Sequence, residues 1–348
     1  MAPGQIMAGT KLVHTVGRTA GTGVCAMGVQ SVTDKEQAVA EPYEFPVEAG
    51  KIREFATATL SCNPVHQTLA AARAAGLAAL PAPPTFVMAS EHYAPGKVIG
   101  ADGLPGGVRS LYGEMDFEYL QPVCAGDLLS VRAGTVTVTG RHGRRGGAMN
   151  LTTTETVFEK GSRPAVIRRG TRIITSVDVS RIGAVPAAQA LAVQHTAVPE
   201  QTLSMDVGGP YPITHARGLR VAQTIARRVL INRTHIVRYA GASGDFAPIH
   251  HDEALAREFG NPSVFAHGMV SGGIIGSMVT DWLGPANIRR LVTRFIGMVF
   301  PGDAIDYRVS IVALQEQDGV QNIDLQLQAS NQRAEIVLTG SARVALPV

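Results

Sequence analysis

The chain has 348 residues, a length that predicts two domains or one long fused unit rather than one small core. Apolar residues make up 45% of the sequence and charged residues 17%, which excludes a disordered or fibrous protein. The net charge is only +3, and the basic residues are scattered along the chain, so the composition does not indicate a nucleic-acid-binding protein.

Cysteine usage and hydropathy bear on the compartment. The three cysteines are isolated, so they have neither the spacing of a zinc site nor the even number of a disulfide framework. No apolar run approaches the ~18 residues of a membrane-spanning helix, and the N-terminus lacks the pattern of a secretory signal. We therefore expect a cytoplasmic protein with no membrane span and no bound metal. Residues 1–43 form an N-terminal extension that fits a tail, a targeting remnant or a misassigned start.

One internal repeat organises the rest of the chain, at an offset of 184 residues (235 minus 51). The segment 51–66, K-I-R-E-F-A-T-A-T-L-S-C-N-P-V-H, aligns without a gap on 235–250, H-I-V-R-Y-A-G-A-S-G-D-F-A-P-I-H. The same offset places A-P-P-T (82–85) on A-H-G-M (266–269). This pattern predicts a tandem duplication. The matched pairs include Ile52 with Ile236, Phe55 with Tyr239, Ala56 with Ala240, Pro64 with Pro248, and His66 with His250.

Each copy continues into three β-rich runs. Valine, threonine and isoleucine alternate with other residues in these runs, which predicts long antiparallel strands with one buried face. Each copy is therefore expected to have helices first and strands after. The runs cover residues 128–138, 149–158 and 165–174 in the first copy, and 305–314, 323–329 and 335–346 in the second.

The stretch 267–283, H-G-M-V-S-G-G-I-I-G-S-M-V-T-D-W-L, is polar almost nowhere and predicts a helix that is buried on all sides. Its glycines would weaken an isolated helix, and they fit a sheet that approaches closely. Residues 183–202, between the copies, are rich in alanine, proline and glutamine and predict a linker. We therefore expect two domains, 44–182 and 203–348, each with an antiparallel sheet around a buried helix. This architecture is α+β.

Residues 239–270 carry a resemblance to a known family. The segment Y-A-G-A-S-G-D-F-A-P-I-H-H, followed by F-A-H-G-M-V, resembles the hydratase-2 motif of MaoC-like (R)-specific enoyl-CoA hydratases and (3R)-hydroxyacyl-thioester dehydratases. The first half, with G-K-I-R-E-F-A and N-P-V-H, is similar to the non-catalytic subunit of the mycobacterial dehydratase pair, and the second half to the catalytic subunit. The resemblance implies a tandem double hot-dog fold. It also implies an enzyme that acts on acyl-CoA or acyl-carrier-protein thioesters without a cofactor.

The resemblance assigns catalytic roles to three residues of the second half. Asp245 and His250 would contact the same water molecule; one of them takes its proton as the hydroxyl adds to the β-carbon. The backbone N–H of Gly268 would receive the thioester oxygen at the start of the buried helix, where unpaired amides and the helix dipole favour negative charge. Glycine suits this position because no side chain blocks the thioester.

Several positions depart from the family pattern. Ala247 stands where the family usually has asparagine, so one hydrogen-bonding side chain near the site is missing. In the first copy, Ser61 occupies the position of the acid, and Pro83 and Pro84 replace the His-Gly step, so the proline has no N–H to offer. We therefore expect an inert, structural first half. Its prolines, Pro81 included, would bend its buried helix and widen the tunnel for long or bulky acyl chains.

Some of these residues also have a simpler interpretation. Asp245 alone could be a turn residue that bonds its own backbone, and it indicates catalysis only together with His250 and the A-H-G-M segment. Asp252 is expected to cap a short helix that ends at Gly260. His267 is expected to orient the loop by hydrogen bonding rather than to react.

The basic loop 139–148, T-G-R-H-G-R-R-G-G-A, allows two interpretations. Its arginines, Arg141, Arg144 and Arg145, could meet the phosphates of coenzyme A. The loop lies between two predicted strands, however, and a solvated hairpin is the simpler structure. We favour the hairpin.

Two other functions stay open. A hot-dog thioesterase would hydrolyse the same thioester, but it normally needs an acid on the buried helix, and residues 267–280 contain none. A protein that binds acyl thioesters without converting them is favoured by Ala247. Because one chain supplies both halves of a hot-dog pair, we expect a monomer or a homodimer. The sequence does not choose between coenzyme A and acyl carrier protein, or between hydration and dehydration.

Overall fold

The computed structural model describes four stretches of the chain, residues 41–95, 108–143, 147–176 and 218–348. The predicted linker 183–202 and nearly all of the predicted extension 1–43 lie outside these stretches. The predicted domain boundaries therefore stay predictions. Within the described residues, the elements of the two halves follow each other in the same order.

The first half begins with a short strand and short helices and ends with four long strands. Two of its helical segments are 3₁₀ turns and are labelled η. The elements are β1 (Tyr43–Pro46), α1 (Ala49–Ala58), η1 (Pro64–His66), α2 (Leu69–Ala74), η2 (Phe86–His92), β2 (Val108–Tyr119), β3 (Leu128–Gly143), β4 (Gly147–Lys160) and β5 (Arg163–Ser176).

The second half repeats this order, so the sequence repeat is also a repeat of structure. Helix α3 corresponds to α1, and the 3₁₀ turn η5 corresponds to η1 residue for residue. The elements are β6 (Thr224–Leu230), α3 (Arg233–Ser243), η5 (Pro248–His250), α4 (Glu253–Glu258), α5 (Gly268–Leu283), β7 (Ile288–Phe295), β8 (Ala304–Gln317), β9 (Val320–Ser330) and β10 (Ile336–Pro347).

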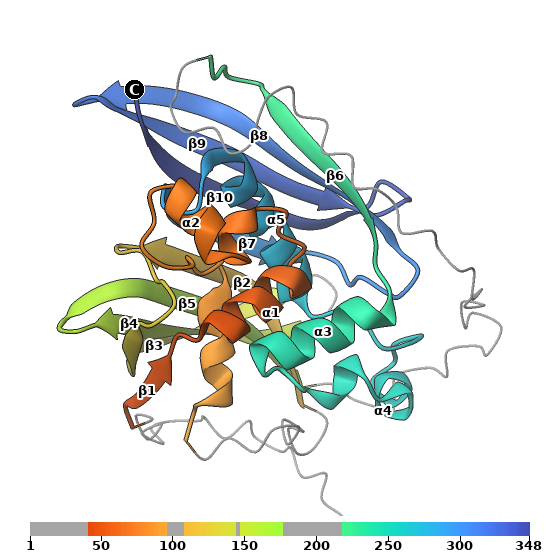
Figure 1. The fold of residues 1–348 in the computed structure, drawn as a ribbon. Coiled ribbons are helices and arrows are strands. Elements are labelled where there is room, and N and C mark those ends of the chain that lie inside the picture. The colour runs from red at the N-terminus through yellow and green to blue at the C-terminus, as the bar shows by residue number, and fades with distance from the viewer. Residues whose placement is uncertain (1–40, 96–107, 144–146, 177–217) are drawn as a thin grey trace, which may run out of the picture. The chain divides into compact units, whose positions relative to one another are not determined.

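The strands form one ten-stranded sheet in the order β1-β3-β4-β5-β2-β7-β10-β9-β8-β6, and every neighbouring pair is antiparallel (Figure 1). The structure therefore has one sheet where two were predicted, because the five strands of each half join edge to edge through β2 and β7, where Met115 lies opposite Thr293. The six predicted runs lie in β3–β5 and β8–β10, which confirms them. An antiparallel sheet with helices on one face is the expected α+β architecture.

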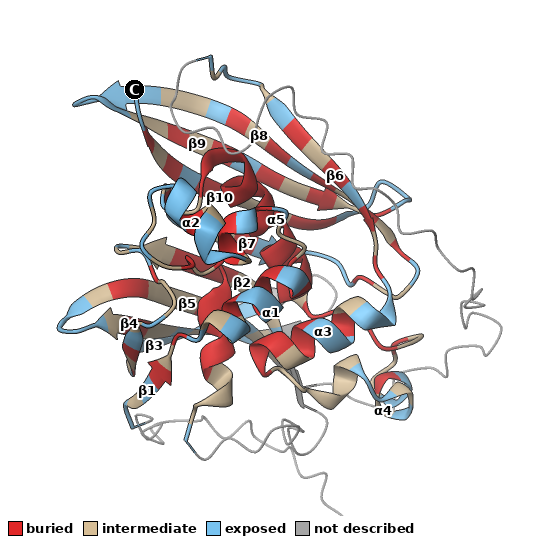
Figure 2. Ribbon diagram, viewed as in Figure 1, coloured by how far each residue is buried: buried red, intermediate tan, exposed pale blue. Residues whose placement is uncertain are grey.

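Helix α5 forms the centre of the second half, and the structure confirms that it is buried on all sides. Every residue from Met269 to Leu283 is buried, as Figure 2 shows along the whole helix. Its side chains, Trp282 among them, join the single hydrophobic core that includes residues of both halves. Among the described residues, none of the helices has the length and apolar character needed to span a membrane.

The glycines of α5 allow close contact with the first half as well as with the sheet. A Cβ atom on Gly273 would lie 2.4 Å from Thr59 Cγ2, and one on Gly276 would lie 3.0 Å from Leu291 and 3.5 Å from Pro84. Such distances leave no room for a side chain. The expectation of a close approach is therefore correct, and the first half supplies part of it.

The corresponding helix of the first half is short. Only the seven residues Phe86–His92 form a helical segment there, and it is a 3₁₀ helix, η2. Pro83 and Pro84 directly precede it, and proline lacks the N–H that an α-helix needs and restricts the residue before it. The first half therefore has a buried turn where the second half has four turns of α-helix.

Two edge strands were not predicted. β1 has only four residues, and in β6 the buried positions are Ile225, Arg227 and Val229, so a buried arginine interrupts the apolar alternation. Arg227 is 2% exposed, and it donates to the Leu60 carbonyl at 2.6 Å and to Cys62 Sγ at 2.9 Å. These bonds satisfy a charged group that the hydrophobic pattern alone would place on the surface.

Candidate active site

Asp245 lies in the loop that follows α3. Gly244 ends the helix in the left-handed conformation, with φ +82°, and a Cβ atom there would lie 3.1 Å from the His92 ring. The backbone N–H of Asp245 donates to Ser243 Oγ at 3.2 Å, and Oδ1 of Asp245 accepts the N–H of Ala247 at 3.3 Å. Asp245 does bond its own turn, as the simpler interpretation expected, and its carboxylate retains further acceptor positions.

His250 ends the 3₁₀ turn η5, which places its ring beside the segment that leads to α5. Its Nδ1 lies 2.8 Å from the Phe265 carbonyl oxygen. Because a carbonyl oxygen only accepts, Nδ1 carries the proton, and in the neutral ring Nε2 is a lone-pair acceptor. Burial lowers the pKa of His250, against the opposing effects of Asp245 and the Phe265 carbonyl. The neutral form is therefore favoured at neutral pH.

His267 joins the two segments of the site. Its Nε2 lies 2.8 Å from the backbone oxygen of Asp245, so Nε2–H donates to this oxygen. Its ring centroid is 3.8 Å from that of His250. Burial, and then the charge of His250, hold the pKa of His267 well below its ordinary value. The bond orients the Asp245 loop, which is the role that the sequence predicts for this histidine.

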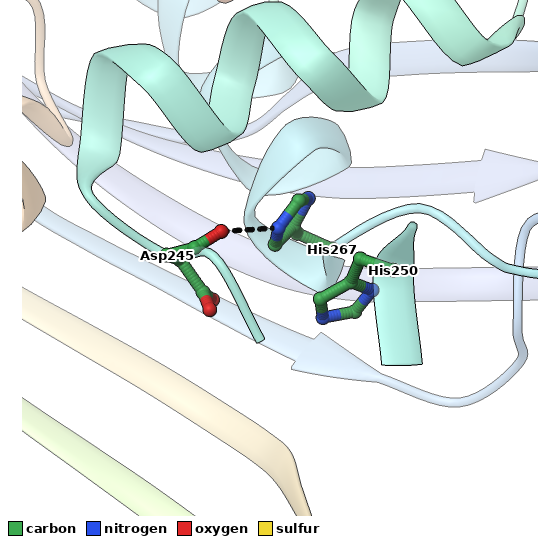
Figure 3. A group of neighbouring side chains, drawn as sticks. All are labelled: Asp245, His250 and His267. Carbon is green, nitrogen blue, oxygen red and sulfur yellow. Dashed lines mark hydrogen bonds between the residues drawn. The ribbon is translucent and has the colours of Figure 1, made fainter. Parts of the chain in front are cut away.

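The three side chains converge (Figure 3). One carboxylate oxygen or ring nitrogen from each of Asp245, His250 and His267 lies within 4.8 Å of the other two. One water molecule can span such a separation with two hydrogen bonds of about 2.8 Å at a near-tetrahedral angle. The set also has the donor types of a metal site, because the second ring nitrogen of each histidine keeps its lone pair when the first donates to a carbonyl.

Gly268 is the first residue of α5 and directly follows His267. No side chain caps this helix end, and as the first helical residue Gly268 has an N–H without a partner inside the helix. A Cβ atom at this position would lie 3.0 Å from the Phe295 ring. The helix dipole adds positive potential at this point. The N–H of Gly268 is thus a hydrogen-bond donor without a helical partner, and it directly follows His267 of the site.

The first half contains the counterpart of this site, with different chemistry. His66 Nδ1 lies 2.7 Å from the Pro81 carbonyl oxygen, which repeats the bond from His250 to Phe265 at the same sequence offset. Ser61 stands in the place of the acid, and Pro84 stands in the place of Gly268. Pro84 has no N–H, and its carbonyl accepts the Tyr119 hydroxyl. The first half therefore keeps the hydrogen bond of the histidine but has lost the acid and the glycine N–H.

A carboxylate from α5 occupies the degenerate site. Asp281, 2% exposed, accepts the Ser61 hydroxyl at 2.6 Å and the Cys62 N–H at 2.8 Å. Burial raises its pKa, while these two donors and the nearby charges of His66 and Arg227 oppose that shift. Residues 267–280 contain no acid, as expected, but the buried helix continues to Leu283 and carries an acid at Asp281.

Ala247 can be compared with Asn63, its counterpart in the first copy. The Asn63 side chain accepts the Val65 N–H at 3.1 Å and so caps η1. No side chain caps η5, because Ala247 has none to offer. The residue missing from the second half is therefore a cap of the turn that carries His250.

The remaining sequence predictions concern surface features. Asp252 accepts the N–H groups of Ala254 and Leu255 and caps α4, as predicted. The strands β3 and β4 pair up to Gly143 and Gly147, so the basic loop is a hairpin. Arg144 and Arg145 lie outside the described residues.

The continuous antiparallel sheet, the duplicated helix-and-strand order and the buried α5 define a tandem hot-dog protein with a carboxylate–imidazole site in its second half. Residues 212–332 match the MaoC like domain, and residues 37–168 match the FAS1-like dehydratase domain region. The second half is therefore a MaoC like domain, and the first half is a FAS1-like dehydratase domain region.

Solved structures agree on the fold. A MaoC-like dehydratase superposes with a TM-score of 0.68 at 23% identity, covering 90% of this chain and 99% of that one. A protein of Mycobacterium tuberculosis whose structure is described as a double hot-dog fold superposes with a TM-score of 0.57 at 14% identity, covering 88% and 96%. The tandem double hot-dog prediction is thereby confirmed.

Sequence relatives match parts of the chain. A UPF0336 protein of Streptomyces avermitilis is 42% identical over 105 residues, 29% of this chain and 67% of the relative. A UPF0336 protein of Leifsonia xyli is 35% identical over 133 residues, 37% of this chain and 85% of the relative. The peroxisomal hydratase-dehydrogenase-epimerase of Saccharomyces cerevisiae is 34% identical over 85 residues, 23% of this chain and 9% of the yeast protein.

Proposed function

We propose that this protein catalyses the (R)-specific hydration of 2-enoyl thioesters, or the reverse dehydration of (3R)-hydroxyacyl thioesters, in fatty-acid or related acyl metabolism. The substrate would be carried by coenzyme A or acyl carrier protein. The observation that carries the proposal is the bond from His250 Nδ1 to Phe265, which leaves a lone-pair nitrogen in a site shared with the Asp245 carboxylate. The yeast relative, which has hydratase in its name, supports it.

In the proposed reaction, Asp245 and His250 hold one water molecule between them. As the water oxygen bonds to the β-carbon, one O–H bond of the water breaks and one of the two side chains accepts the proton. A proton returns to the α-carbon on the same face. Positioned proton transfer of this kind typically contributes a factor of about 10²–10⁴ in rate.

The Gly268 N–H would stabilise the thioester oxygen, on which negative charge grows as the hydroxyl adds. A backbone donor aimed at such an oxygen is worth about 3–4 kcal/mol. The unpaired N–H at the start of α5 supports this role, and glycine is required there because a side chain would meet the Phe295 ring. The first half, with Pro84 in the equivalent place, would contribute structure rather than chemistry.

Two alternatives rest on particular residues. A thioesterase could use Asp281, but this acid lies thirteen residues along α5 from Gly268, ~20 Å at the rise of an α-helix, and is engaged with Ser61 and Cys62. A protein that only binds thioesters is favoured by the uncapped turn at Ala247.

Incubation of the full-length protein with crotonyl-CoA separates these functions by mass spectrometry. Hydration adds one water molecule and gives (R)-3-hydroxybutanoyl-CoA, which chiral analysis of the released acid identifies. A thioesterase would release free coenzyme A, and a binding protein would leave the ester unchanged. We expect the gain of water with (R) configuration, and either other result contradicts the proposal.

A further inference from the structure

Two polar side chains of the first half, Tyr112 on β2 and Arg172 on β5, form a pair that the proposed reaction does not use. The two residues are direct partners in the antiparallel register, so their side chains lie on the same face. Arg172 donates to the Tyr112 hydroxyl at 2.9 Å, and its guanidinium lies 4.9 Å from the centroid of the Tyr112 ring. This stacking fixes the position of the charged group.

The backbone is shaped to hold this pair. The register of β2 and β5 shifts between Tyr112 and Glu114, so Gly113 is the extra residue of a β-bulge, and a Cβ atom on it would lie 2.9 Å from Ile173. On the facing strand, a Cβ atom on Gly170 would lie 3.4 Å from the Tyr112 ring. Bulges commonly redirect a side chain next to a functional site. A merely solvated arginine would need neither glycine.

This face of β5 is turned toward the candidate active site. Arg168 and Arg172 share a face because side chains alternate along a strand. Arg168 pairs at 3.2 Å with Glu91 of η2, the turn whose last residue, His92, bonds the Gly241 carbonyl at 2.9 Å. The His92 ring also packs against Gly244, the residue directly before Asp245. The turn η2 thus connects this face of β5 to the loop that carries Asp245.

The charges on the two faces of β5 differ. Arg169, on the opposite face, pairs with Glu118 at 3.2 Å and with Glu155 at 2.8 Å. Arg172 is exposed, and within the described part of the chain no carboxylate forms an ion pair with it. Tyr112 most strongly, then the charge of Glu91 and last that of Asp245 raise the pKa of Arg172, so its guanidinium lies within electrostatic reach of both carboxylates.

The hydroxyl of Tyr239 is a second polar group near Asp245 and Tyr112. The Tyr239 side chain is fully buried, and its hydroxyl has no hydrogen-bond partner among the described residues. Burial raises the pKa of Tyr239, and so do the charges of Asp245 and Tyr112 nearby. The neighbouring Ser243 hydroxyl donates its own proton to the Tyr239 carbonyl. Polar groups of both halves therefore lie near Asp245, and a plain alkyl chain would leave them without hydrogen-bond partners.

We propose that Arg172, held by Tyr112, binds a carboxylate carried on the acyl chain, so that the preferred substrates are thioesters of dicarboxylic acids. This inference rests on the proposed function, because it places the acyl chain beside Asp245. The planar guanidinium matches the two oxygens of a carboxylate. The phosphates of the coenzyme are a pantetheine arm away from the thioester, whereas Arg172 lies near the acid of the site.

Binding of saturated esters, which cannot be hydrated, tests the inference. Calorimetric titration would compare butanoyl-, hexanoyl- and octanoyl-CoA with succinyl-, adipoyl- and suberoyl-CoA, pairs that differ only in a terminal methyl or carboxylate. We expect at least one pair in which the carboxylate ester binds roughly 10-fold more tightly, as a charge-assisted hydrogen bond of about 1.5–3 kcal/mol allows. Equal or weaker binding of the carboxylate ester in all three pairs overturns the inference.

The variants Arg172→Met and Arg172→Lys test whether Arg172 causes the difference in affinity. Arg172→Met should reduce the ratio of the dissociation constants of the alkyl ester and the carboxylate ester to about one. Arg172→Lys should keep part of this ratio, because lysine retains the positive charge but cannot make two parallel hydrogen bonds to a carboxylate. Arg343→Met, on the strand β10 with Asp324 as its partner, is the matched control and should keep the ratio. A ratio that survives in Arg172→Met contradicts the role of this residue. If no ester of either series binds, the proposed function fails with it; if both series bind alike, only this inference fails.

Discussion

Replacement of Asp245 by asparagine is expected to lower the rate of enoyl-thioester hydration by a factor of about 10²–10⁴. Asparagine keeps the shape of the side chain and can still accept the Ala247 N–H through its oxygen, so the loop should persist. It cannot accept a proton from water at neutral pH. The value of kcat for crotonyl-CoA, measured by the absorbance of the conjugated ester, reports the loss.

A matched control lies seven residues further along the chain. Asp252 caps α4, and asparagine is about as good a cap, so Asp252→Asn changes the same functional group without loss of the helix. This variant should retain the rate of the unmodified protein. Equal rates in Asp245→Asn and Asp252→Asn would remove Asp245 from the reaction.

Replacement of Asp281 by alanine is expected to cost about 3 kcal/mol in the free energy of unfolding, because it removes a buried acceptor from two partly buried hydrogen bonds. The Ser61 hydroxyl and the Cys62 N–H lose their partner, and the buried guanidinium of Arg227 loses a nearby negative charge. These groups belong to both halves, so the variant weakens the contact between α5 and the first half. Urea unfolding followed by circular dichroism measures it.

Asp306→Ala serves as the control for this stability measurement. Asp306 also pairs with an arginine, Arg228, but Arg228 is exposed and the Asp306 side chain is only partly buried. Exposed ion pairs contribute about 0–1 kcal/mol. A loss in Asp281→Ala no larger than that in Asp306→Ala would show that the carboxylate of α5 does not hold the halves together.

The fold could be predicted from the sequence wherever a pattern repeats or alternates. The long strands, the buried helix and the duplication follow from hydrophobic period and from one aligned segment. β6 could not be found in this way, because its central buried residue is Arg227, whose partners at Leu60 and Cys62 are distant in sequence. Tertiary contacts provide the hydrogen-bond partners of this guanidinium, and the local sequence pattern does not reveal them.

The candidate site could be predicted only in part. Asp245, His250 and Gly268 are near one another in sequence and belong to a recognisable motif, and the structure brings the two side chains together and places Gly268 directly after His267. The tautomer of His250 depends on the Phe265 carbonyl, fifteen residues away, and only coordinates reveal it.

The contribution of the first half could not be anticipated from sequence. Arg172 and Tyr112 are more than seventy and one hundred and thirty residues from Asp245 (245 minus 172 is 73, and 245 minus 112 is 133). The proposal places them at the site because the sheets join and η2 contacts the segment that leads to Asp245. In this proposal the first half, which lacks the acid, takes part in recognition and not in chemistry, and the titrations with the two series of esters test this role.

The central claim is that one carboxylate and one imidazole act on the same water molecule, and a double-mutant cycle tests it most directly. The hydration rate is measured for Asp245→Asn, His250→Gln and the double variant with one enoyl thioester. Groups that act as a unit are strongly non-additive, so the double variant should be little slower than the slower single variant. A double variant whose loss equals the product of the two single losses would contradict the claim.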